Sequence, residues 1–375
     1  MKTALVHDWL NQVGGAEDVL ETLVDLYPDA PIYTSLYWRS KMPPHWRAWD
    51  VRTSFIDRLP LAHKRQQLYF PLYPTAFEQF DFSAYDLVIS NKSGFCHGIV
   101  TGPETVHICY CLTPTRYVWR YHQYAEQENL GRVTRTVLPP FLTFLRQWDR
   151  LAADRVDHFV AISQEVRRRI AKVYQRDAAI IYPPVDTQRF APSAHVEDYY
   201  LLVGRLVPYR RIDLLIEAFN KMDRPLLIAG AGRDRERLEA LAGPTVRFLG
   251  YVPEADLPDL MARCRAFIFP GEEDFGIAPL QAMAAGRPVI AYAAGGALET
   301  VIPGETGALF AEQSVAAMVA AVENFDPAAL DPRCLRAHAE KFDTAVFRRK
   351  LTRFVETKLE EGRRANVRTF ARSNV

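Results

Sequence analysis

Short apolar runs alternate along this chain with segments in which apolar residues recur at a helical spacing. The first run spans residues 3–6, and a helical pattern begins after it near Ala16. The other runs predict strands at residues 32–36, 87–90, 106–111, 159–162, 199–203, 226–229, 246–249, 266–269 and 289–291. Strands and helices that alternate in this way predict parallel sheets with helices on both faces, an α/β fold.

The pattern stops at Pro183-Pro184 and then starts again, so we expect two similar α/β halves. A length of 375 residues also favours two domains over one. We predict an N-terminal domain of residues 1–185, a second domain of residues 186–342 and a C-terminal segment of residues 343–375. That segment should hold an amphipathic helix over residues 343–359, followed by a frayed polar tail. Another helix, over residues 130–151, should be broken by Pro139-Pro140.

Composition narrows the class of protein. The net charge of +1 gives no basic field that would attract nucleic acid, so no nucleic-acid partner is expected. The five cysteines form no C-x-x-C motif and are expected to be reduced thiols, which is typical of a cytoplasmic protein. We expect no signal peptide, and no apolar run approaches the ~18 residues of a spanning helix.

Two basic segments leave peripheral membrane contact open. Residues 59–80 mix His63-Lys64-Arg65 with many aromatic residues and could meet a lipid headgroup. The alternative for this segment is a solvated loop followed by a packed stretch. Arg167-Arg168-Arg169 could likewise be a patch for acidic membranes or an ordinary solvated helix face.

Ligand-type residues follow the predicted strands of the second half. Gly204, Arg205 and Arg210 follow one strand, and the acidic turn around Glu273 follows another, just before a helix with Pro279 in its first turn. Carboxyl ends of parallel strands line one crevice. Guanidinium groups and helix N-termini suit a diphosphate, and a carboxylate suits sugar hydroxyls. The sequence therefore predicts a nucleotide-sugar site.

Several motifs together resemble the family 4 glycosyltransferases of GT-B fold, over nearly the whole chain. They are His7-Asp8-Trp9 with Gly14-Gly15-Ala16-Glu17, the diphosphate motif from Gly204 to Arg210, the stretch from Glu273 to Gln281 in place of the E-x7-E motif, and Gly295-Gly296-Ala297-Leu298-Glu299-Thr300. Residues 111–119 and 182–186 are most similar to bacterial mannosyltransferases of O-antigen and exopolysaccharide pathways.

The resemblance implies two Rossmann-like domains that face a cleft, with the C-terminal helix crossing back to the N-terminal domain. It implies retaining transfer of a hexose, first of all mannose, in the synthesis of cell-surface polysaccharides such as lipopolysaccharide. The expected donor is GDP-mannose, or else a UDP-hexose, and the expected acceptor is a glycan or a lipid-linked intermediate at the inner face of the plasma membrane. No metal or other cofactor is expected, because two guanidinium groups can neutralise the diphosphate.

The resemblance also assigns roles to residues. Arg205 and Arg210 would stabilise the departing phosphate, and Glu273 would hold the hydroxyls of the donor sugar, so these three are the expected catalytic residues. The expected donor-binding residues are Gly14, Gly15, Gly204, Tyr251, Val252, Phe275, Gly276, Ile277 and Gln281. The expected acceptor-binding residues are His7, Asp8, Arg116 and Tyr117.

The chain departs from the family pattern at three positions. Gln281 replaces the second acid of E-x7-E, and Arg210 replaces the usual lysine. Leu112 stands where relatives often carry a histidine, so no acid or base acts from that position, and only His97, His107 or His122 could lie near. A departing phosphate that takes the acceptor proton itself would need no protein base.

These departures keep a second hypothesis open, a catalytically reduced GT-B protein that binds a nucleotide or sugar as a regulator or partner. An epimerase of the same fold would need further carboxylates in the cleft, and the sequence identifies none. Slow release of nucleotide from GDP- or UDP-sugars would distinguish an active enzyme from a binding protein.

Overall fold

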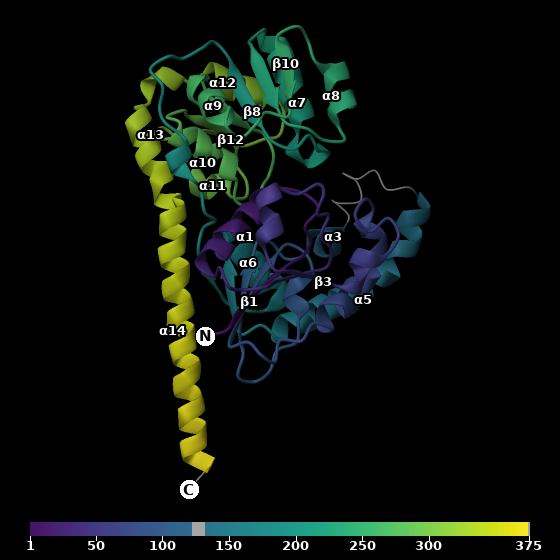
Figure 1. The fold of residues 1–375 in the computed structure, drawn as a ribbon. Helices are drawn as coiled ribbons and strands as arrows, with labels where there is room; N and C mark the ends of the chain where they lie inside the picture. Colours follow the sequence, from purple (N-terminus) through teal and green to yellow (C-terminus); the bar gives the residue numbers. More distant parts are fainter. Residues whose placement is uncertain (122–131, 374–375) are drawn as a thin grey trace. The chain divides into compact units, whose positions relative to one another are not determined.

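The computed structural model describes residues 1–121 and 132–373, which form two compact units (Figure 1). Unit 1 contains Met1–Tyr182 and Phe347–Val375, and unit 2 contains Pro183–Val346. Each unit is built around one parallel sheet with its own apolar core, as the alternating pattern predicted.

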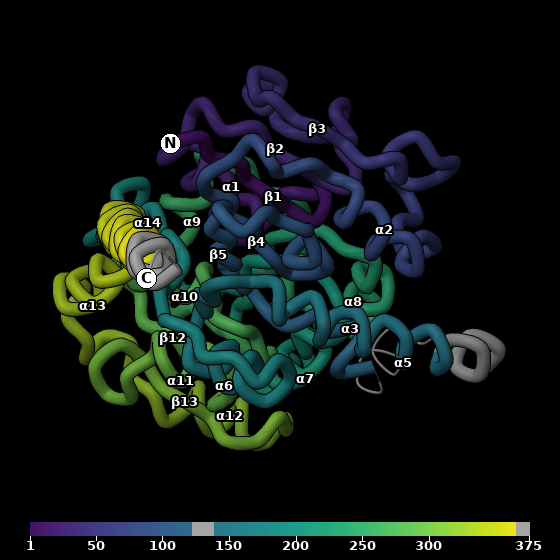
Figure 2. Tube along the Cα trace, turned by 90° about the horizontal axis from the view of Figure 1, so that it is seen from below, coloured from purple at the N-terminus to yellow at the C-terminus, as the bar shows by residue number. Residues whose placement is uncertain are grey.

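The sheet of unit 1 has seven strands in the order β3-β2-β1-β4-β5-β6-β7, and Figure 2 shows β3, β2, β1, β4 and β5 side by side. Neighbouring strands all pair in parallel. The order reverses at β1, so the carboxyl ends of β1 and β4 form the switch point at which doubly wound sheets bind ligands. The strands are β1 (Thr3–His7), β2 (Ile32–Thr34), β3 (Val51–Thr53), β4 (Leu87–Lys92), β5 (Val106–Cys111), β6 (His158–Ala161) and β7 (Ala178–Ile180).

The helices of unit 1 follow its strands along the chain. They are α1 (Gly15–Leu26), α2 (Tyr73–Glu78), α3 (Arg116–Trp119), α5 (Arg132–Asp154), α6 (Gln164–Tyr174) and α14 (Thr344–Ser373), with short 3-10 helices η1 (Pro44–Ala48), η2 (Phe55–Arg58), η3 (Gln66–Leu72) and η4 (Cys96–Gly98). Ser163 caps α6 as its sequence position predicted, since its hydroxyl accepts a hydrogen bond from the Val166 amide at 3.1 Å.

Two predictions about helices are wrong. Helix α5 is continuous through Pro139 and Pro140. The cost of interior prolines, roughly 3 kcal/mol each, is offset because Leu142 and Leu145 of the same helix are buried. Helix α14 continues to Ser373, whereas the sequence predicted a helix that ends near residue 359 and a frayed tail over residues 363–375 (Figure 1). Its Phe347 and Leu351 are buried, as their helical spacing predicted.

Residues 59–80 form a loop, then η3, then α2, whose Tyr73 and Phe77 are fully buried. The packed stretch of the second interpretation is therefore present. Arg168 of the arginine run is exposed and pairs with Glu165, as expected of a solvated helix face. No helix in the described parts of the chain is both long and apolar enough to span a bilayer.

The sheet of unit 2 has six parallel strands in the order β10-β9-β8-β11-β12-β13, and its switch point lies between β8 and β11. The strands are β8 (Tyr200–Val203), β9 (Leu226–Ala229), β10 (Val246–Gly250), β11 (Phe267–Phe269), β12 (Val289–Tyr292) and β13 (Gly307–Phe310). The helices are α7 (Ile212–Met222), α8 (Arg235–Leu241), α9 (Leu257–Arg263), α10 (Ile277–Ala284), α11 (Ala297–Thr300), α12 (Val315–Glu323) and α13 (Pro332–Ala339).

A buried histidine makes unit 1 sensitive to acid. His107 on β5 is fully buried, with its Nε2 2.9 Å from the Ser90 hydroxyl, and burial lowers its pKa from 6.5 to about 3. The His107 side chain is therefore protonated below about pH 6.5 in the unfolded chain but stays neutral in the folded chain. The free energy of unfolding is unaffected by this group above pH 6.5 and decreases as the pH falls below it. We expect His107 alone to cost ~2 kcal/mol at pH 5.

Urea unfolding at pH 7 and at pH 5 measures this effect. His107→Gln keeps a partner for Ser90 but does not titrate, so its loss of stability between the two pH values should be smaller than that of the unaltered protein. The same pH dependence in both proteins would contradict the assignment.

Candidate functional site

An arginine and a carboxylate meet at the switch point of unit 2. Arg210 lies in the loop after β8, in a short 3-10 turn (Pro208–Arg210), and Glu273 lies in the turn after β11. Arg210 Nη2 is 3.0 Å from Glu273 Oε1, and both side chains are largely shielded from solvent. The sequence predicted both residues for a nucleotide-sugar site, and the structure brings them into direct contact because β8 and β11 are neighbours in the sheet.

Glycine residues around this pair leave the space that it occupies. A Cβ atom on Gly204 would lie 1.8 Å from Arg210 Nη1, so only glycine leaves the guanidinium in its observed place. Gly295 has a φ of +58°, and a Cβ there would lie 2.1 Å from the backbone oxygen of Glu273. The adjacent Gly296 amide donates to that same oxygen at 2.9 Å. The glycines therefore let the loops after β8, β11 and β12 pack backbone against backbone.

The turn that holds Glu273 leads into helix α10. Phe275 is buried, Gly276 has a φ of +93°, and Ile277 begins the helix with no side-chain cap on its first amides. Such amides carry partial positive charge and suit the oxygens of a phosphate. Gln281 lies one turn further along the same helix and is half-buried.

The other predicted donor residues of unit 2 follow the carboxyl ends of strands in the same sheet. Arg205 is exposed, with its Nη2 3.3 Å from the Tyr209 hydroxyl. Tyr251 and Val252 follow β10, which β9 separates from β8, and the Tyr251 side chain is 76% exposed. This end of the sheet therefore offers cationic groups beside β8 and an exposed ring further out.

In unit 1, the predicted acceptor residue Asp8 is fully buried at the end of β1. Its carboxylate accepts hydrogen bonds from the backbone amides of Ser93, Gly94, Phe95 and Cys96, at 2.6–2.8 Å. Asp8 thus holds the loop after β4 at the switch point. Both of its carboxylate oxygens are engaged by these bonds.

His7, another predicted acceptor residue, is also buried. Its Nε2 is 3.3 Å from Glu17 Oε1 and its Nδ1 is 3.3 Å from Asn91 Nδ2. Donation by Nε2–H to Glu17 and acceptance by Nδ1 from the Asn91 amide satisfy both contacts. Gly14 and Gly15, predicted to bind the donor, stand at the N-terminus of the same helix as Glu17.

Arg116 and Tyr117 form the start of α3 and are half-buried. The Tyr117 ring stacks on Phe70, with centroids 4.4 Å apart. The nearby Leu112 is buried. Of the histidines considered in its place, His97 is buried and bonded to the Asp149 backbone oxygen at 3.2 Å, His107 is bonded to Ser90, and His122 lies outside the described residues.

The sequence interpretation missed a buried charged network beneath α3. Lys92, the last residue of β4, is fully buried and donates to the Thr113 backbone oxygen at 3.1 Å and to the Thr115 hydroxyl at 3.2 Å. Asp149 of α5 is also fully buried. Its Oδ1 accepts from Thr115 at 2.8 Å, and its Oδ2 accepts from Trp119 Nε1 at 2.6 Å and from the Tyr174 hydroxyl at 2.8 Å.

This network keeps an ammonium ion inside the unit. Burial is the largest influence on the pKa of Lys92 and lowers it, but Asp149 together with Cys111, Cys109 and Asp8 raises the pKa above its usual value. Hydrogen bonds to Lys92 and Asp149 therefore hold residues 113–119 in place. A lysine three residues after the apolar run Leu87-Val88-Ile89 was the sequence signal that could have revealed the network.

Metal ligands do not gather anywhere in the part of the chain that the structure describes, in the sense that no three Cys, His, Asp or Glu side chains lie close enough to share an ion. Charged groups at the unit 2 switch point include the Arg210–Glu273 pair and the nearby Arg205.

Two family models match consecutive parts of the chain. "Glycosyltransferase Family 4" matches residues 13–189, and "Glycosyl transferases group 1" matches residues 186–326. Together they reach from the start of α1 to beyond the last strand of unit 2.

Curated relatives carry mannosyltransferase names. The chain is 33% identical over 219 residues to a GDP-mannose-dependent alpha-(1-6)-phosphatidylinositol monomannoside mannosyltransferase of Mycolicibacterium smegmatis, covering 50% of this chain and 56% of the relative. It is 32% identical over 190 residues to a GDP-mannose-dependent monoacylated alpha-(1-6)-phosphatidylinositol monomannoside mannosyltransferase of Corynebacterium glutamicum, covering 42% of this chain and 50% of the relative. The chain thus spans about half the length of these relatives.

Solved structures show the same fold at low identity. Anabaena Alr3699/HepE in complex with UDP has a TM-score of 0.70 and 20% identity, over 95% of this chain and all of that chain. Sucrose-phosphate synthase from Thermosynechococcus elongatus has a TM-score of 0.74 and 18% identity, over 96% of this chain and all of that chain. With two doubly wound sheets and both family models matched, the chain belongs to the family 4 glycosyltransferases of GT-B fold.

Proposed function

We propose that this protein is a retaining mannosyltransferase that moves mannose from GDP-mannose to a glycan or lipid-linked acceptor. The observation that carries the proposal is the Arg210–Glu273 pair at the switch point of unit 2, beside the start of α10. A guanidinium, a carboxylate and free helix amides are the groups that a sugar linked to a diphosphate requires.

Arg210 can serve the pair and a ligand together. Its guanidinium presents five N–H donors in a planar fork, and Nη2 contacts Glu273, so one group can meet a carboxylate and a phosphate oxygen on different sides. Arg205, which is exposed near Tyr209, supplies the second cation. Negative charge grows on the departing diphosphate as the glycosidic bond breaks, and fixed donors lower the energy of that state.

Glu273 holds the sugar in this proposal. Its contact with Arg210 orients it, and its carboxylate can accept hydrogen bonds from sugar hydroxyls. Gln281 would contact the ribose as a neutral group. We assign the front face of the sugar to the acceptor, with the departing phosphate taking the acceptor proton, since Leu112 offers no base.

The names of the mannosyltransferase relatives support GDP-mannose as the donor, and their phosphatidylinositol mannoside acceptors support a lipid-linked acceptor here. A UDP-hexose is the second choice. We place the reaction in cell-surface polysaccharide synthesis at the inner face of the plasma membrane, without a metal ion. In unit 1, Arg116 and Tyr117 would contact the acceptor, while His7 and Asp8 would position the loops around it.

A thermal-shift panel of GDP, UDP and ADP tests the donor. GDP at 100 times its dissociation constant should stabilise the protein by ~2.7 kcal/mol, and UDP and ADP at the same concentration by less. GDP-mannose should then release GDP slowly in the absence of acceptor. Stabilisation by UDP alone would mean that the donor is a UDP-hexose. Binding of GDP without release of GDP from GDP-mannose would favour the catalytically reduced protein.

A further inference from the structure

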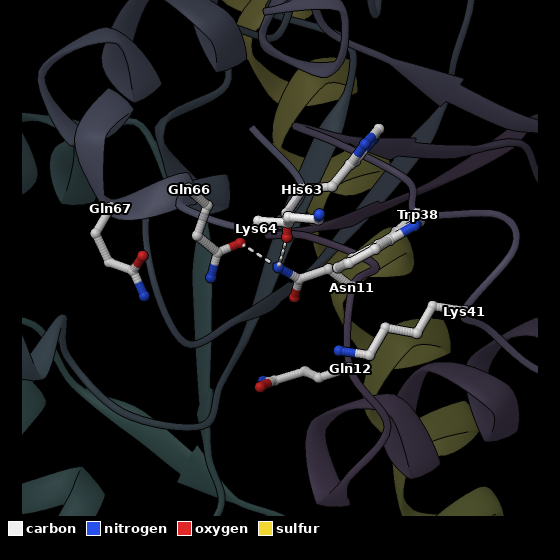
Figure 3. Close-up of a pocket in the computed structure, with 8 residues that line it drawn as sticks. All are labelled: Asn11, Gln12, Trp38, Lys41, His63, Lys64, Gln66 and Gln67. Atoms are coloured by element: carbon white, nitrogen blue, oxygen red, sulfur yellow. Dashed lines mark hydrogen bonds between the residues drawn. The ribbon is translucent and has the colours of Figure 1, made fainter. Parts of the chain in front are cut away.

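Unit 1 contains a pocket of about 360 Å³ at the carboxyl ends of β1 and β2. Gln66 and Gln67 line one side, Trp38 and Lys41 line the other, and Asn11 and Gln12 lie between them (Figure 3). His63 and Lys64 complete the lining. The sequence suggested a lipid headgroup for the segment with His63 and Lys64 but assigned no acceptor contact to any of these side chains, and none belongs to the Arg210–Glu273 site.

The backbone of β1 and β2 continues beyond both strands to form the floor. Leu10 and Tyr37 make an isolated parallel bridge, in which the Leu10 amide donates to Leu36 and the Trp38 amide donates to Leu10, at 2.9 and 2.8 Å. This pairing fixes Asn11 and Trp38 next to one another. The pocket therefore rests on the sheet and not on a free loop.

The wall formed by residues 63–67 is also held in place. Asp57 accepts from the Tyr37 amide at 2.9 Å and lies 2.8 Å from His63 Nε2, so it connects the end of β2 to this wall. Asn11 Nδ2 donates to Gln66 Oε1 at 2.8 Å across the pocket. The His63 ring stacks on Trp38, with centroids 5.8 Å apart.

The lining combines three kinds of chemistry. The amides of Asn11, Gln66 and Gln67 can donate to and accept from hydroxyl groups. Trp38 supplies a half-buried apolar surface of the kind that carries a sugar ring. Lys41, whose Nζ lies 4.9 Å from the Trp38 ring centroid, and Lys64 supply positive charge. The described residues that line the pocket include no acidic side chain.

We propose that this pocket binds the acceptor of the transfer reaction and that the acceptor is a sugar bearing a phosphate or diphosphate group. The amides take the hydroxyls, Trp38 takes the ring, and the two lysines take the phosphate. The side chains of Lys64 and Gln67 form no hydrogen bond or ion pair with any of the described residues. The proposal rests on the proposed function and names its acceptor.

The phosphate could belong to a soluble sugar phosphate or to a lipid carrier. Leu61 and Leu68 flank Lys64 in the sequence and are 57% and 62% exposed. Exposed leucines beside basic residues suit the boundary between lipid headgroups and acyl chains. We therefore include a lipid arm in the experiment.

Calorimetric titration in saturating GDP tests the pocket, because GDP occupies the proposed phosphate site of unit 2. The probes are the 1-phosphates of mannose, glucose and N-acetylglucosamine, each compared with its neutral methyl glycoside. At least one 1-phosphate should bind about tenfold more tightly than its glycoside, a difference of ~1.4 kcal/mol. Raising the salt concentration should weaken this preference, because exposed charges are screened.

Variants separate the pocket from the donor site. Lys41→Gln with Lys64→Gln should abolish the preference for the phosphate, while Trp38→Ala should weaken binding of the phosphate and the neutral glycoside alike. Lys172→Gln, an exposed lysine on α6 of the same unit, is the matched control and should keep the preference. GDP binding should be unchanged in all of them, so a loss of GDP binding would point to failure of the proposed function or of folding.

The lipid arm uses flotation with phosphatidylcholine vesicles that contain or lack a polyprenyl phosphate sugar. Tighter binding to the sugar-bearing vesicles than to the soluble sugar phosphate identifies a lipid-linked acceptor, and equal binding identifies a soluble one. The proposal is overturned if no sugar phosphate is preferred over its neutral glycoside, or if the double lysine variant retains the preference.

Discussion

Replacing Arg210 with alanine is expected to lower the rate of glycosyl transfer by ~10²–10³-fold without unfolding the protein. Two effects add in this variant. The departing diphosphate loses a fixed cationic donor, and Glu273 loses the partner that stands 3.0 Å away. A steady-state assay of transfer from GDP-mannose, with urea unfolding alongside, measures both consequences.

Two further variants make this result specific. Arg210→Lys keeps the charge but loses the planar fork, so we expect an intermediate rate. Arg265→Ala removes an arginine of the same unit that precedes β11. It lies at the amino end of that strand, away from the site, and pairs with Asp198 at 2.7 Å. This variant should transfer at the unaltered rate. If Arg210→Ala were as active as Arg265→Ala, Arg210 would have no part in stabilising the leaving group.

Replacing Asp149 with alanine is expected to destabilise the protein by ~3–5 kcal/mol, the largest stability effect that we predict. The change leaves the Lys92 ammonium buried without its carboxylate and removes the acceptor of Thr115, Trp119 and Tyr174. Urea unfolding monitored by tryptophan fluorescence gives the free energy of unfolding. A transfer assay on the protein that remains folded gives its activity.

Matched changes on the same helix separate charge from packing. Asp149→Asn keeps an acceptor oxygen and should cost less than alanine, although Lys92 still loses its counter-charge. Asp154→Ala removes an exposed carboxylate that pairs with Arg150, and it should cost below ~1 kcal/mol. A small effect of Asp149→Ala, similar to that of Asp154→Ala, would mean that Lys92 is neutral in the folded protein.

The strands that define both sheets were predictable because a parallel strand covered on both faces reads as an uninterrupted apolar run. The runs at residues 87–90 and 226–229 became β4 and β9 in this way. By contrast, β3, β7 and β13 were missed. The β3 triplet Val51-Arg52-Thr53 has almost no apolar signal, and it is a strand because β2 offers it an edge.

The candidate site was predictable residue by residue but not as a geometry. Arg210 and Glu273 were each selected for their chemistry, yet their contact depends on the order of strands across the sheet, which spacing along the chain does not encode. Asp8 shows the converse. A carboxylate at a strand end suggests a ligand contact, but here the amides of the loop after β4 occupy it. The partners of a polar side chain depend on tertiary structure.

Helix α14 has a consequence for the order of events on the ribosome. Unit 2 is one continuous stretch of chain, whereas unit 1 is completed by residues 347–375, which are made after unit 2. The buried Phe347 and Leu351 cover apolar surface of unit 1, and the Phe347 ring lies 5.5 Å from that of Tyr110. Domains fold largely as they emerge during synthesis. Residues 1–182 must therefore wait, with the apolar surface that α14 covers still exposed, until unit 2 has been made.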